Sequence, residues 1–122
     1  MQPNRRFTAS VWMLPLLVLP VLVAQGPAGD LGPGKEVYEQ FCASCHGDTG
    51  KGDGPAAAVL TPKPKDLSDK GYMGTKSDDQ LFKVVKEGGA AGGLSPLMPP
   101  WGTSLTDAQI REVIVYLRSI AK

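Results

Sequence analysis

The 122-residue sequence is poor in the side chains that most often bind metals or form cross-links, with two cysteines and one histidine. A structural zinc site needs about four such ligands at matched spacings, so the sequence disfavours a zinc-binding domain. Basic and acidic residues nearly balance, at 13 and 12. No basic stripe appears along the chain, which argues against nucleic acid as a partner. No segment alternates as a strand does, so the prediction is an all-α fold.

Both cysteines and the only histidine lie in one run, Cys42-Ala43-Ser44-Cys45-His46. A C-x-x-C-H run is typical of covalent haem attachment, in which each thiol adds to a haem vinyl group. The imidazole of His46 then lies beneath the porphyrin and binds the iron on one side. A thioredoxin-like site is disfavoured because no strand precedes the run. A disulfide between Cys42 and Cys45 would close too small a loop to stabilise much.

A haem bound in this way needs a second axial ligand, and the sequence has no second histidine. A methionine sulfur suits haem iron and raises its reduction potential. Of the four methionines, Met1 and Met13 lie near the N-terminus, which leaves Met73 and Met98. Met98 is favoured because two prolines follow it and stiffen the backbone. Met73 is flanked by glycines and is predicted to fill the core.

The N-terminal residues resemble an export signal. Arg5 and Arg6 form a short basic start, and an apolar run over residues 11–24 follows. The run is short for a membrane-spanning helix, which needs about 20 residues. We predict that residues 1–24 are a signal peptide and that the protein is periplasmic; an uncleaved membrane anchor is the alternative. Without Arg5 and Arg6, the 13 basic residues fall to 11 against 12 acidic ones, a net charge of −1.

The rest of the chain predicts a flexible lead-in and one small domain. The lead-in covers residues 25–33, which are rich in glycine and proline, and the domain covers residues 34–122. Apolar residues three and four apart predict a first helix over about residues 34–45. Ser77 and Thr106 each begin a capping-box pattern that predicts a further helix. Loops as long as those between the three helices are expected only where they pack against a cofactor.

With these motifs, the chain resembles a class I c-type cytochrome over about residues 34–121. The resemblance is carried by Gly34-x-x-x-Tyr38-x-x-x-Cys42-x-x-Cys45-His46-Gly47, the glycine-rich loop from Asp48 to Pro55, Met98-Pro99-x-Trp101-Gly102, and Val113-x-x-Tyr116-Leu117-Arg118. It implies three main helices wrapped around one covalently bound haem. It also implies that the first and last helices cross at four residues: Gly34, Tyr38, Val113 and Tyr116. A proline carbonyl, of Pro62 or Pro64, is expected to accept the Nδ1–H of His46.

The resemblance further implies one haem c bound through Cys42 and Cys45, with His46 and Met98 as its axial ligands. With both axial positions filled, the protein would carry single electrons between redox partners in brief encounters, without an enzyme activity of its own. Two alternatives stay open: a fixed subunit of a dehydrogenase or oxidase complex, and a gas-binding or peroxidase-like protein with an open iron site. We expect no nucleic acid partner, and a membrane only if the N-terminal segment is uncleaved.

Overall fold

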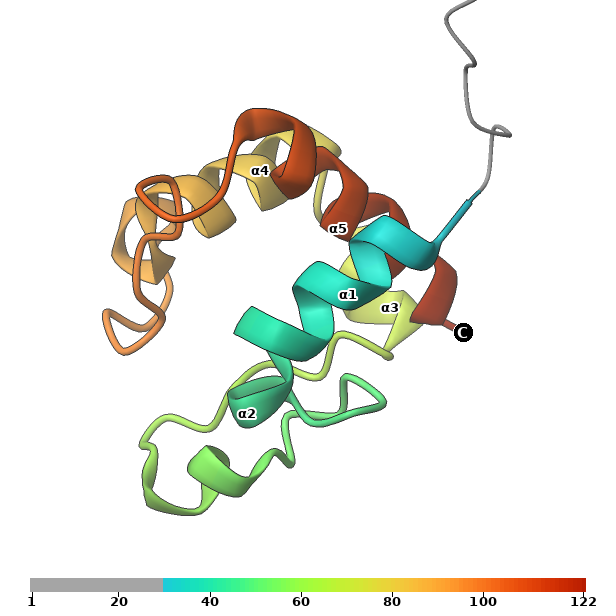
Figure 1. The fold of residues 1–122 in the computed structure, drawn as a ribbon. Helices are drawn as coiled ribbons and strands as arrows, with labels where there is room; N and C mark the ends of the chain where they lie inside the picture. The colour runs from blue at the N-terminus through green and yellow to red at the C-terminus, as the bar shows by residue number, and fades with distance from the viewer. Residues whose placement is uncertain (1–29) are drawn as a thin grey trace, which may run out of the picture.

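The computed structural model describes residues 30–122, so the predicted signal peptide and most of the predicted lead-in lie outside the described residues. Within them the fold is helical and contains no strand, which confirms the predicted all-α class (Figure 1). The α-helices are α1 (Gly32–Phe41), α2 (Ala43–His46), α3 (Lys70–Gly74), α4 (Asp78–Glu87) and α5 (Asp107–Ile120). Two 3₁₀-helices, η1 (Pro55–Val59) and η2 (Gly89–Gly92), lie in the loops. None of the helices formed by these residues is long and apolar enough to cross a membrane.

Both ends of the predicted first helix differ from the observed ones. Helix α1 begins at Gly32, two residues before the expected boundary of the domain. The reason is that Pro33 lies in the first turn, where a helix does not use the backbone N–H that proline lacks. The predicted lead-in therefore extends too far. At the other end, Cys42 has a φ of −116° and separates α1 from the short helix α2.

The two predicted capping boxes are confirmed, and each begins a long helix. The Ser77 side chain accepts a hydrogen bond from the Gln80 N–H at the start of α4. Thr106 and Gln109 form the same pair at the start of α5. Helix α3 was not predicted, because five residues that include two glycines show no apolar period. Its first turn is instead held by Asp69, whose carboxylate accepts two backbone N–H groups.

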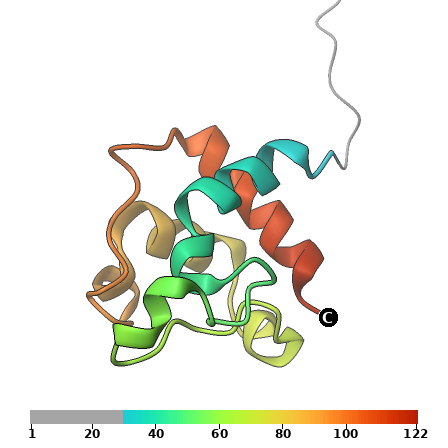
Figure 2. The ribbon, with the colours of Figure 1, turned by 60° about the horizontal axis from the view of Figure 1, so that its bottom comes forward.

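Helix α1 lies across α5, and the two helices approach closely at the residues that the sequence predicted (Figure 2). A Cβ atom on Gly34 would overlap the backbone carbonyl oxygen of Glu112. The rings of Tyr38 and Tyr116 pack at the same crossing, with centroids 5.3 Å apart and planes tilted by 52°. Tyr38 and Val113 are fully buried. The predicted crossing is therefore confirmed, and the absence of a side chain at Gly34 makes it possible.

A buried hydrogen bond connects this crossing to the predicted attachment run. The Tyr38 hydroxyl donates to the carbonyl oxygen of Gly47 over 2.6 Å. Burial raises the pKa of Tyr38, so its hydroxyl stays protonated and remains a donor. Gly47 directly follows His46, and the bond therefore fixes where α2 ends relative to α1 and α5.

We expect Gly34→Ala to lower the free energy of unfolding by about 1–3 kcal/mol, because the added methyl group forces α1 away from α5. Gly74→Ala is the matched control, since a Cβ at Gly74 has no neighbour within 4 Å. The control should change stability by less than about 0.5 kcal/mol. Urea unfolding of the haem-loaded proteins measures both effects, and equal midpoints for the two variants would contradict the role assigned to Gly34.

Candidate haem site

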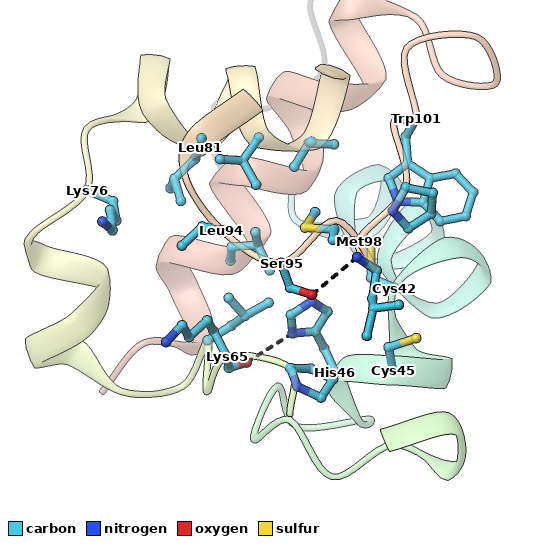
Figure 3. A pocket seen from close by; sticks show the side chains of 18 of the residues that line it. Cys42, Cys45, His46, Lys65, Lys76, Leu81, Leu94, Ser95, Met98 and Trp101 are labelled. Carbon is cyan, nitrogen blue, oxygen red and sulfur yellow. Dashed lines mark hydrogen bonds between the residues drawn. The ribbon is translucent and has the colours of Figure 1, made fainter. Parts of the chain in front are cut away.

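One pocket of about 590 Å³ gathers the four residues that the sequence predicted for the site (Figure 3). Cys42 and Cys45 come from the end of α1 and from α2, His46 ends α2, and Met98 comes from the loop before α5. Most of the other lining side chains are apolar and include Leu81, Val85 and Leu117. The volume lies in the range of about 300–1,000 Å³ that is usual for ligand and cofactor pockets.

The donor set of this pocket fits a covalently bound haem. Cys42 and Cys45 are free thiols and are half-buried at the pocket wall. His46 lies next to them, and Met98 lies above it in the view of Figure 3. An imidazole and a thioether are ligands that haem iron takes in cytochromes, and the apolar walls suit a flat apolar macrocycle. Burial raises the pKa of the Cys42 thiol to about 12. A thiol so protonated is a poor nucleophile.

The imidazole of His46 is oriented by a backbone carbonyl. Its Nδ1 atom lies 3.0 Å from the carbonyl oxygen of Lys65. A carbonyl oxygen only accepts, so Nδ1 carries the proton and Nε2 keeps the lone pair that a metal ion would bind. Burial lowers the pKa of His46, and the bond to Lys65 partly opposes this shift. The ring is therefore neutral at pH 7 and available as a ligand.

The prediction that Pro62 or Pro64 accepts this hydrogen bond is wrong. The acceptor is Lys65, one residue beyond the second proline. The carbonyl of Pro64 faces the glycine-rich loop, where a Cβ on Gly52 would overlap its oxygen. The carbonyl of Lys65, the next residue along the chain, is the one that reaches the ring. The sequence could not distinguish the two, because either carbonyl belongs to the same short loop.

The Met98 loop is held by backbone groups at the end of α4. The Gly89 N–H donates to the Met98 carbonyl over 3.0 Å, and the Trp101 N–H donates to the Val85 carbonyl over 2.9 Å. The last carbonyls of a helix have no partner within the helix, so such a loop satisfies them. Gly88 has a φ of +91°, which disfavours a side chain, and a Cβ there would lie within 3.2 Å of the Met98 carbonyl oxygen. The loop is therefore fixed by hydrogen bonds as well as by its prolines.

Met73 is 1% exposed and belongs to the hydrophobic core, outside the pocket lining. This confirms that it is a core residue.

The pocket lining also includes Lys65, Tyr72 and Lys76, to which the sequence analysis assigned no function. They come from a loop, from α3 and from the residues after α3, so no regular spacing relates them. The only signal was their position between the C-x-x-C-H run and the Met98 loop.

The family model described as "Cytochrome C oxidase, cbb3-type, subunit III" matches residues 29–117. The cbb3-type cytochrome c oxidase subunit CcoP of Azospirillum sp. (strain B510) is 34% identical over 82% of this chain and 33% of its own length. This chain therefore spans about a third of that oxidase subunit. Cytochrome c-554(547) of Halothiobacillus neapolitanus is 30% identical over 76% of this chain and 99% of its own length.

The solved structure titled KustC0563 c-type cytochrome has the same fold, with a TM-score of 0.56. The likeness covers 73% of this chain and 98% of that one at 23% identity, so it shows the fold alone. The family match, the relatives and the helical fold agree with the C-x-x-C-H run and the pocket around it. The chain belongs to the class I c-type cytochromes, matches the domain found in subunit III of cbb3-type oxidases, and carries one covalently attached haem c.

Proposed function

We propose that this protein is an exported electron carrier in which Cys42 and Cys45 bind the haem and His46 and Met98 are its axial ligands. The observation that carries the proposal is that Met98 lines the same apolar pocket as the Cys42–His46 run, although the two segments lie far apart in the sequence. A relative of nearly the same length as the domain, cytochrome c-554(547), supports the function of a small cytochrome.

When bound, the haem supplies an iron that gains and loses one electron, and the chain fixes the surroundings of that iron. His46 offers Nε2 in a fixed direction because its Nδ1–H is held by the Lys65 carbonyl. The Met98 loop is held against α4, so its sulfur would be fixed as the second ligand and would keep water and small molecules from the iron. Ligands fixed in this way need to move little when the charge of the iron changes.

The pocket opens where a partner protein can approach. Leu97 lines the pocket and is 50% exposed. Two lysines, Lys63 and Lys83, are among the other residues that line it. A small apolar contact with charges around it is typical of the brief encounters of redox proteins. These features support transient redox partners.

A second function, as a fixed subunit of an oxidase complex, is favoured by the match to the cbb3-type subunit III domain. The two functions differ in what the protein binds to in the cell. For a free carrier, we expect the haem-loaded protein in the soluble periplasmic fraction, at the size of a single small domain. Cell fractionation followed by gel filtration measures this. Recovery of the protein in membranes together with a terminal oxidase would favour the second function.

Met98→Ala should remove the charge-transfer absorption band that a methionine sulfur gives with oxidised haem iron. It should also lower the reduction potential, because the thioether ligand favours reduced iron. The same variant should bind carbon monoxide in its reduced form, since its iron has an open position. Absorption spectra and a redox titration of the purified haem-loaded protein measure all three effects.

Met73→Leu is the control, because it replaces the other methionine of the domain without leaving a cavity in the core. It should keep the absorption band, the potential and the resistance to carbon monoxide of the wild type. An unchanged spectrum in Met98→Ala would show that Met98 is not the ligand. A wild-type protein that binds carbon monoxide as readily as Met98→Ala would favour the gas-binding alternative.

A further inference from the structure

The pocket has two chemically different ends. Figure 3 shows Cys42 and Cys45 on one side and Lys65 and Lys76 on the other. The first end carries the thiols that take part in haem attachment. The second end carries positive charge, in a pocket whose other lining residues are mostly apolar.

One aromatic ring holds the two lysines together. The Lys65 Nζ lies 5.8 Å from the centroid of the Tyr72 ring, and the Lys76 Nζ lies 5.5 Å from it. Distances within about 6 Å allow a favourable cation–π interaction. Tyr72 is half-buried and itself lines the pocket. The ring therefore gathers two like charges at one edge of the cavity.

These two charges lack a carboxylate partner among residues 30–122. The ion pairs found there join Lys35 to Glu39, Lys86 to Asp107 and Arg118 to Asp78. Two ammonium groups on one ring repel each other, and an anion bound beside them would turn this repulsion into attraction. The arrangement is that of a site for a negatively charged group.

A haem has its two vinyl groups on one part of its rim and its two propionate carboxylates on another. Because Cys42 and Cys45 would bind the vinyl side, the propionates would face away from the thiols, toward Lys65 and Lys76. We infer that Lys65, Lys76 and the Tyr72 ring between them form a propionate-binding site, called here the propionate clamp. The inference rests on the proposed haem attachment through Cys42 and Cys45.

Two further contacts fix the clamp in place. Arg118, near the end of α5, donates to the carbonyl of Met73 over 2.6 Å and to the carbonyl of Lys76 over 2.5 Å. The guanidinium also pairs with Asp78 over 2.9 Å, so α5 holds the connection between α3 and α4. On the other side, the Lys65 carbonyl accepts from His46. Lys65 thus orients the proximal imidazole with its backbone and the propionates with its side chain.

The clamp has a consequence for the reduction potential. Reduction adds one negative charge at the iron, and nearby ammonium groups stabilise that charge. Lys76→Gln should therefore lower the potential, and adding Lys65→Gln should lower it further. Both shifts should shrink at high salt, because these side chains reach solvent. Tyr72→Leu keeps both charges but removes the ring, so it should give a smaller shift in the same direction.

Lys83→Gln is the matched control, because Lys83 also lines the pocket but does not lie on the Tyr72 ring. Redox titrations of the purified haem-loaded variants at low and high salt give the potentials. Proton NMR of the oxidised proteins gives the propionate methylene resonances. We expect these resonances to move in Lys65→Gln and Lys76→Gln and to stay in place in Lys83→Gln.

The clamp is overturned if Lys76→Gln shifts the potential no more than Lys83→Gln and leaves the propionate resonances in place. The clamp is also overturned if the variant with both Lys65→Gln and Lys76→Gln changes only the salt dependence of electron transfer to an anionic oxidant. The two lysines would then bind partners and not the propionates. In either result, an unchanged methionine–iron band would show that the proposed function still stands. A wild-type protein without bound haem would overturn the proposed function itself.

Discussion

The close contact of α1 with α5 at Gly34 is the constraint on which the rest of the structure depends. Helix α1 leads directly into the C-x-x-C-H run, and the Tyr38 hydroxyl holds the residue after His46. Helix α5 carries Arg118, which holds the loop between α3 and α4. One helix crossing therefore sets the position of the thiols at one end of the pocket and of the lysines at the other.

The apolar surface of this small domain is divided between a core and a cofactor pocket. Core residues of α5 such as Ile110 and Val113 are fully buried. The pocket opens between that core and two long loops, one carrying Lys65 and the other Met98. Such loops have little secondary structure of their own, and they are fixed by bonds to His46 and to the end of α4. A haem filling the pocket would complete the core that a short chain cannot build alone.

Local patterns in the sequence were sufficient to predict the parts of this arrangement that depend on neighbouring residues. The capping boxes at Ser77 and Thr106 predict where two helices begin. In each box, the first residue and the residue three positions later bond to each other's backbone N–H groups, which the helix leaves without partners. The acceptor for His46 and the grouping of Lys65 with Lys76 depend instead on how distant loops fold together. Such contacts have no spacing in the sequence, and only the structure shows them.

The most direct test of the account is proton NMR of the reduced, haem-loaded protein with ¹³C-labelled methionine methyl groups. A sulfur bound to iron places its methyl group over the porphyrin, whose ring current displaces the resonance far from its usual position. We expect one strongly displaced methyl resonance, from Met98, while the methyl resonance of the buried Met73 stays outside that region. No displaced methyl resonance, or one that is assigned to Met73, would contradict the account.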